Sequence, residues 1–139
     1  MNSVIVEKAN RIIGTCKNAY IGLIDDQGFP VVSTIGTLNS ESIFDSYFVT
    51  GTRSNKYKCL KKNKRGSVCY HDGSNNITLI GEIEVLTDQE TKSRFWQPWF
   101  TEFFPLGETD PAYCVLKFHT KRVLLWIDGE SAAFNIDEI

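Results

Sequence analysis

The sequence predicts a mainly β protein: a small antiparallel β-barrel of six or seven strands with flanking helices. Two observations lead to this expectation. Short runs of β-branched and aromatic residues alternate with clusters of Gly, Asn, Asp and Ser, which is the pattern of strands joined by tight turns. Few segments have helical spacing, and closing the resulting sheet into a barrel would remove its exposed edges. The 139 residues suffice for one core, so a single domain over residues 1–139 is expected.

The first half of the chain is expected to form a helix and then a three-stranded meander. Residues 3–17 carry apolar side chains near helical spacing, with charged residues between them. Residues 19–24 have strand-forming side chains on both faces, and the DDQG turn that follows leads into a returning strand over 30–37. A second turn over 38–42 precedes a strand over 43–50.

The second half is expected to hold strands over 67–72 and 77–86, an aromatic helix, and two final strands over 112–118 and 122–127. The sequence TDQE after residue 86 has the spacing of a capping box and would open the helix, which Pro105 would end. Its aromatic side chains are expected to be partly core and partly a contact between subunits. They are Phe95, Trp96, Trp99, Phe100, Phe103 and Phe104.

Composition and cysteine spacing exclude several classes of function. A formal net charge of −2 gives no reason to expect nucleic acid or a membrane surface as the main partner. The four cysteines have no C-x-x-C spacing, so neither a zinc ribbon nor a redox pair is indicated. Cys69 and His71 share one face of a strand, but two ligands do not make a metal site. With neither a signal sequence nor a membrane-spanning apolar run, a soluble cytoplasmic protein with reduced thiols is expected.

Residues 47–71 hold the most suggestive local chemistry. They read as the end of a strand, a Gly-Thr-Arg-Ser turn, a short basic helix capped by Ser54, and a new strand. The hydroxyls of Thr50 and Ser54, the Lys56 ammonium and the free N–H groups of the helix start would together bind a phosphate. The same residues also fit an ordinary capped helix with solvated lysines. The spacing alone leaves both interpretations open.

Taken in order, several motifs resemble one known family. They are the first strand followed by DDQGFP, then YFVTGTRSNK, ITLIGEIEVLTD, WFTEFFPLGETDPAYCVLKF and RVLLW. Over nearly its whole length the chain resembles the FMN-binding split-barrel superfamily that includes pyridoxamine 5′-phosphate oxidase, and within it the bacterial general stress protein group. The resemblance implies a single split-barrel domain that forms a homodimer and binds two FMN molecules at the shared interface.

The resemblance also implies which residues bind the cofactor. Val49 and Thr50 match strand positions that touch the flavin and its phosphate. Ser54, Asn55 and Lys56 stand where the family has a phosphate-binding Ser-Arg-Lys triplet, so Asn55 replaces the usual arginine.

The remaining matches lie on other strands. Ser33 and Thr34 fall on the strand whose backbone follows the isoalloxazine edge, and Ser33 occupies a position that is commonly an arginine in the oxidases. Asn76 matches an amide near the ring, and Trp126 matches a tryptophan supplied by the second subunit. The loss of two arginines removes two bidentate phosphate contacts.

Three functions are compatible with these residues. The first is a flavin-dependent oxidoreductase acting on an unknown small molecule, and the second is a flavin-binding protein without turnover. The third is an interaction module whose aromatic surface is its function. Oxidation of pyridoxamine phosphate is not expected, because the C-terminal WIDGESAAFNIDEI lacks the family's arginine and histidine. A larger flavin or a deazaflavin would share the phosphate contacts with FMN.

No catalytic residue stands out in the sequence. His71 and His119 lie in strand patterns that are typical of packed or surface histidines. Glu108 and Asp110 fit turn and capping roles as well as acid–base roles. The flavin would carry the redox chemistry, and the protein would position it.

Overall fold

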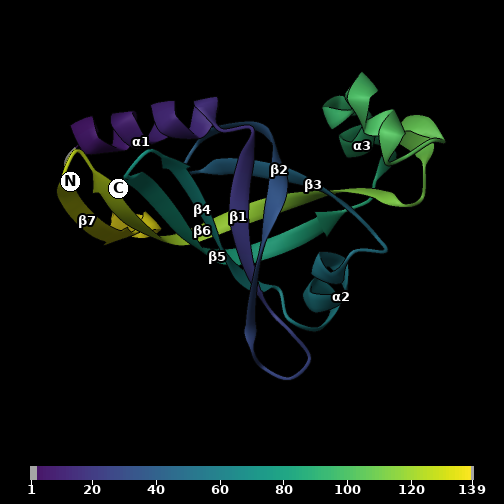
Figure 1. Cartoon of the computed structure of the whole chain (residues 1–139), viewed down its shortest axis with the longest axis horizontal. Coiled ribbons are helices and arrows are strands. Elements are labelled where there is room, and N and C mark those ends of the chain that lie inside the picture. Colours follow the sequence, from purple (N-terminus) through teal and green to yellow (C-terminus); the bar gives the residue numbers. More distant parts are fainter. Residues whose placement is uncertain (1–2, 139) are drawn as a thin grey trace.

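The computed structural model describes residues 3–138, and the side chains of residues 39–41 lie outside that description. Helices, strands and 3-10 turns follow one another along the chain (Figure 1). They are α1 (Ser3–Thr15), β1 (Asn18–Ile24), β2 (Pro30–Ser42), β3 (Asp45–Gly51), α2 (Asn55–Lys62), β4 (Arg65–Asp72), β5 (Asn75–Leu86), α3 (Gln89–Phe95), η1 (Pro98–Glu102), η2 (Gly107–Thr109), β6 (Tyr113–Ile127), β7 (Glu130–Asn135) and η3 (Ile136–Glu138).

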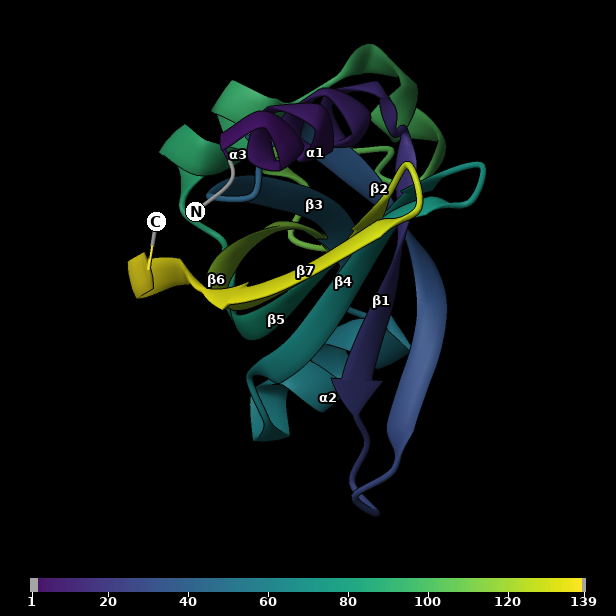
Figure 2. The same cartoon turned by 90° about the vertical axis from the view of Figure 1, so that its left-hand side faces the viewer.

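In the described part of the chain, seven strands form one antiparallel sheet in the order β3-β2-β1-β4-β5-β6-β7. A further pairing of β3 with β6 closes six of these strands into a barrel, and β7 lies outside it on the edge of β6. Helices α1 and α3 lie on one side of the barrel and α2 on the opposite side (Figures 1 and 2). The predicted fold class, a mainly β antiparallel barrel with flanking helices, is confirmed.

The core fills the barrel because alternate strand residues point inward. On β5, Ile77, Leu79, Gly81 and Ile83 are buried, and the residues between them are half-buried. A second apolar cluster lies between the aromatic segment and the barrel. The fully or nearly buried members of that cluster are Leu38, Phe95, Phe100, Phe104, Tyr113 and Val115.

The aromatic segment is not one helix. Helix α3 ends at Phe95, the backbone is extended at Trp96 and Gln97, and the 3-10 turn η1 begins at Pro98. The α conformation is disfavoured before a proline, whereas proline itself suits the first position of a helical turn. The capping residue of α3 is Asp88, whose carboxylate accepts a hydrogen bond of 3.0 Å from Thr91 N, one residue later than the predicted box.

The end of the chain also differs from expectation. The two predicted strands over 112–118 and 122–127 are one long strand, β6, which changes register against β5 between Ile80 and Gly81. Such a bulge bends a strand without any turn residue, so its position is not marked in the sequence. Strand β7 was not predicted, although Asp128 and Gly129 both have positive φ, as a tight hairpin requires.

Strand β2 is longer than predicted. It continues to Ser42 through the residues expected to form a turn, with an irregular register against β3 between Leu38 and Ser42. Helix α1 ends at Thr15, two residues earlier than expected. None of the described helices is long and apolar enough to cross a bilayer.

Replacing Gly81 with alanine is expected to lower the free energy of unfolding by at least about 2 kcal/mol, because the new methyl would collide with the main-chain oxygen of His119 at the bulge. Gly14→Ala is the matched control. Nothing lies within 4 Å of a methyl at that position in α1, and alanine favours helix by about 0.5–1 kcal/mol over glycine. Urea denaturation followed by circular dichroism measures both variants. Equal effects would contradict a close backbone approach at Gly81.

Candidate functional site

A cavity of about 570 Å³ lies between strands β2 and β3 and the aromatic turn η1. Its floor is made by short side chains of the two strands, including Thr34, Gly36 and Val49. Two cations, Arg53 and Lys56, line one part of it. The volume is in the range of sites for small molecules and cofactors. We call this space the aromatic cavity.

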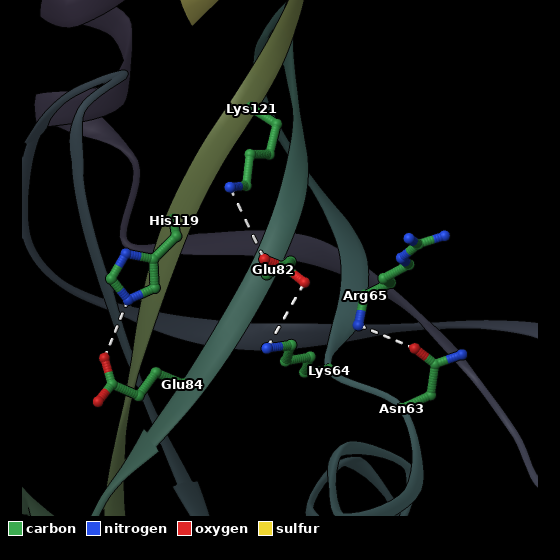
Figure 3. A network of polar contacts seen from close by, with 7 residues as sticks. All are labelled: Asn63, Lys64, Arg65, Glu82, Glu84, His119 and Lys121. Carbon is green, nitrogen blue, oxygen red and sulfur yellow. Dashed lines mark hydrogen bonds and ion pairs between the residues drawn. The ribbon is translucent and has the colours of Figure 1, made fainter.

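A larger groove of about 880 Å³ lies on the outer face of β1, β4, β5 and β6. None of the nine site residues predicted from the sequence lines it. At its edge, Glu82 lies between Lys64 at 3.7 Å and Lys121 at 3.8 Å, and both ammonium groups point toward it in Figure 3. These distances belong to exposed ion pairs, which contribute little to stability. We therefore take the smaller cavity as the candidate site.

His119 belongs to the same exposed network. Its Nε2 lies 2.9 Å from Glu84 Oε1 on the neighbouring strand (Figure 3). His71 stacks on Tyr20, with ring centroids 5.6 Å apart. Neither histidine lines the aromatic cavity.

The wall of the aromatic cavity is made by Trp99, Phe100, Phe103 and Phe104. Phe100 and Phe104 are buried and anchor the wall in the second apolar cluster, whereas Trp99 and Phe103 are 51% and 64% exposed. The Trp99 ring meets Phe100 edge to face at 4.5 Å, and its Nε1 lies 3.2 Å from Gln97 Oε1. The wall therefore offers oriented aromatic surface that is open to a ligand.

A buried polar cluster holds this wall against the barrel. The Asp110 carboxylate accepts hydrogen bonds from the main-chain N–H groups of Leu106 at 3.2 Å and Ala112 at 2.9 Å. The buried Lys92 ammonium donates to Asp110 O at 2.9 Å, and the Tyr113 hydroxyl donates to Lys92 O at 2.9 Å. Asp110 is thus a turn-stabilising residue, which was one of its two predicted roles.

The hydroxyls of the predicted phosphate turn are used within the turn. Ser54 Oγ accepts from Tyr57 N at 3.2 Å and donates to Gly51 O at 2.7 Å. Thr50 Oγ1 lies 3.1 Å from Ser54 Oγ, and since Ser54 has given its hydrogen to Gly51 O, Thr50 is the donor of that pair. Ser54 is therefore an N-cap of α2, and both hydroxyl hydrogens are already paired.

Arg53 and Lys56 carry the positive charge of the aromatic cavity. No carboxylate of the described residues lies within ion-pair distance of Arg53 or Lys56. Burial lowers the pKa of the Lys56 ammonium below its ordinary value of 10.5. Arg53 is exposed at the cavity and is absent from the residues predicted for the site. The sequence feature that could have indicated Arg53 is its position one residue before the helix cap.

The structure brings together only some of the predicted residues. Thr34, Val49, Thr50 and Lys56 line the aromatic cavity, and Ser54 lies directly behind Thr50. Ser33, next to Thr34 on β2, does not line it.

Asn55 does not line the aromatic cavity either. Its amide lies 3.8 Å from Cys59 Sγ on the next turn of α2. It borders a different, smaller groove beside Asp25 and Asp26.

Asn76 and Trp126 lie elsewhere on the barrel. They are cross-strand partners on β5 and β6, and Trp126 is 42% exposed. The path from Gly36 on β2 to Trp126 crosses β1, β4 and β5, which at the usual strand spacing is about 19 Å along the sheet. Within one chain this pair is not part of the aromatic cavity.

The described residues hold no group of three or more His, Cys, Asp or Glu side chains that could bind a metal ion. All four cysteines are free thiols.

The chain is similar to known proteins over nearly its whole length. The family model described as pyridoxamine 5′-phosphate oxidase like matches residues 5–137. A solved structure from Clostridium acetobutylicum, of a protein related to general stress protein 26 of B. subtilis, has a TM-score of 0.88 at 24% identity, with 99% of each chain covered. No curated protein matches. The resemblance predicted from the sequence is confirmed.

Two other solved structures share the fold and bind different groups. A pyridoxamine 5′-phosphate oxidase-related, FMN-binding protein from Nostoc punctiforme has a TM-score of 0.58 at 14% identity, with 96% of this chain and 94% of that chain covered. A heme-binding protein from Mycobacterium smegmatis has a TM-score of 0.74 at 12% identity, with 94% of this chain and 57% of that chain covered. Such low identities establish the fold alone.

Ser54→Ala is expected to lower the free energy of unfolding by about 1 kcal/mol, because the first turn of α2 loses its cap. Asn55→Ala, at the next position, serves as the control and should change stability by less than about 0.5 kcal/mol. Urea titrations of both variants give the comparison. A Ser54 variant as stable as the parent would contradict the capping role.

The stability of the protein is expected to decline in alkali partly through Tyr113 and Cys114. Burial raises the pKa of Tyr113 from 10.0 to about 12 and that of Cys114 from 9.0 to about 11. The pKa is higher in the folded than in the unfolded protein, so folding favours the neutral side chain. The contribution of Tyr113 to the free energy of unfolding is therefore complete below pH 10 and is lost as the pH rises to 12. Cys114 acts in the same sense between pH 9 and 11.

The test compares unfolding midpoints across this pH range. Tyr113→Phe should flatten the decline between pH 10 and 12, and Cys114→Ala should flatten it between pH 9 and 11. An unchanged slope in the phenylalanine variant would show that the Tyr113 hydroxyl is solvated in the folded protein.

Proposed function

Since the chain belongs to the pyridoxamine 5′-phosphate oxidase-like family, we propose that it binds FMN in the aromatic cavity and acts as a flavin-dependent oxidoreductase on a small molecule. One observation carries the proposal: the aromatic cavity combines two cations that form no ion pair among the described residues with short strand residues and aromatic rings. A flavin mononucleotide has the matching parts, an anionic phosphate and a planar tricyclic ring.

The residues of the cavity divide between the two ends of such a ligand. Lys56 and Arg53 would face the phosphate, and Lys56 is partly desolvated there. Thr34, Gly36 and Val49 leave a shallow floor for the ring, and Trp99 would lie at its edge. When bound, the flavin supplies the redox chemistry, and these residues hold it and exclude water.

The chemistry of the cavity favours a flavin over a heme. Heme iron in proteins takes an axial ligand such as His, Cys, Met or Tyr. None of the described residues that line the aromatic cavity has an imidazole, thiol, thioether or phenol. A heme would therefore have no ligand from this chain in that space.

A homodimer would complete the site. Asn76 and Trp126 do not line the aromatic cavity of their own chain. In a two-fold dimer that pairs the outer faces of two barrels, they would cover the partner's cavity. That face exposes Tyr20, Val32 and Leu124, and exposed apolar side chains of this kind mark interaction surfaces.

The substrate side of the cavity has few reactive groups. Apart from Arg53 and Lys56, the described lining residues carry no ionisable side chain, so protons of the reaction would come from solvent or from the partner. The same observation favours a second candidate, a flavin-binding protein without turnover. Reoxidation of the reduced, protein-bound flavin separates the two, because only an oxidoreductase has an acceptor that accelerates it specifically.

The location that suits this function is a reducing compartment such as the cytoplasm. The four thiols are unpaired, and free thiols persist where glutathione and thioredoxin keep them reduced. Neither a nucleic acid nor a membrane is proposed as a partner, because the net charge is only −2.

The shared site is tested by complementation between two damaged proteins. Lys56→Ala and Trp126→Ala should each weaken FMN binding as homodimers. After mixing and subunit exchange, about half of the dimers are mixed, and each mixed dimer has one intact site, so about a quarter of all sites should recover parental affinity. FMN fluorescence quenching measures the recovery.

The control mixes Lys56→Ala with Arg53→Ala, which damage the same half of the site and cannot complement. Mixed dimers that form without recovering affinity would rule out a site shared between protomers. A parental protein that neither carries nor binds FMN would overturn the proposed function, and the aromatic surface would then be left as an interaction module.

A further inference from the structure

Arg53 occupies a position that compensates for the arginines missing from the phosphate turn. The residues at positions 33 and 55, where the resemblance leads one to expect arginine, are Ser33 and Asn55, and neither lines the aromatic cavity. We propose that Arg53 is the second cationic ligand of the flavin phosphate and the residue by which the site selects a phosphate monoester over an uncharged flavin. This inference rests on the proposed function.

The two positive charges of the cavity match a divalent anion. Arg53 and Lys56 line it together, and its described lining includes no carboxylate. The described acidic side chains with an ion-pair or hydrogen-bond partner of this kind have it elsewhere, at Lys8, Lys64, His119 and Lys121. A phosphate monoester carries a charge of about −2 at pH 7, which two cations balance.

The hydrogen-bond donors that remain free in the turn also indicate a role for Arg53. The hydroxyl hydrogens of Thr50 and Ser54 are already given to Ser54 Oγ and Gly51 O. Tyr57 N is held by Ser54, which leaves the first two N–H groups of α2, the Lys56 ammonium and the Arg53 guanidinium for an anion. Without Arg53, a single side chain would have to bind the phosphate.

The backbone on both sides of Arg53 is fixed. Thr52 N donates to Ala112 O at 2.8 Å, and Ser54 N donates to Gly51 O at 3.1 Å. The side chain therefore starts from a defined point between the barrel and the cap of α2. A guanidinium fork placed there can take two phosphate oxygens at once, which an ammonium cannot.

Parallel titrations with FMN and riboflavin test the inference, because the two ligands differ only in the phosphate. Arg53→Ala should weaken FMN binding by about tenfold, the scale of one charge-assisted bond at a partly exposed site. Riboflavin affinity should stay within about twofold of the parent. Arg53→Lys should recover part of the FMN affinity, because it restores the charge without the fork.

Lys58→Ala is the matched control, since this exposed lysine of the same helix does not line the aromatic cavity. It should leave both affinities unchanged. If Arg53→Ala weakened FMN and riboflavin equally, or neither of them, the role of Arg53 would be excluded while flavin binding stood. If the parental protein bound neither flavin, the proposed function itself would fail, and this inference with it.

Discussion

The pairing of β3 with β6 is the interaction on which the rest of the structure depends. It closes the barrel through pairs such as Val49 with Val115 and Thr50 with Cys114. The same pairing brings the end of β3 next to Ala112, where Thr52 N finds its acceptor. The turn before α2 and the aromatic segment before β6 are therefore held side by side. The cavity forms at this junction because β6 both closes the barrel and begins after the aromatic segment.

The aromatic segment keeps its place through polar groups that are buried under it. Lys92 is only 5% exposed, yet its ammonium has a main-chain acceptor at Asp110 and the Tyr113 ring at 5.4 Å. A buried cation is costly unless it is paired in this way. The arrangement defines one position for the loop that carries Phe104. Trp99 is exposed, but the adjacent Phe100 is part of the core and anchors the turn that carries both rings.

Alternation of apolar and polar residues was enough to predict the barrel, since strands such as β5 must bury one face. It could not locate the bulge near Gly81, because a bulge has no characteristic residue. Pro98 and Asp128-Gly129 are local signals for the break after α3 and for the final hairpin, and neither was used in the prediction. In the site, Thr34, Val49, Thr50 and Lys56 line one cavity, and their role in binding a cofactor stays a prediction. Arg53 was not predicted because a motif compares residues by their position in the sequence. Whether a side chain lines the cavity depends on its direction in the folded chain. Asn76 and Trp126 lie on another part of the barrel, and their contact with a partner's cavity belongs to the proposed dimer.

The hydrogen bonds within the turn before α2 bear on how a cofactor would bind. Thr50, Ser54 and Gly51 form hydrogen bonds with one another. The turn therefore has its final conformation as soon as the chain has folded. Little conformational freedom remains to be lost when a cofactor arrives, so its capture would be governed by diffusion and charge and not by a slow rearrangement. If the protein binds FMN as proposed, the backbone of this turn should be nearly the same with and without the cofactor.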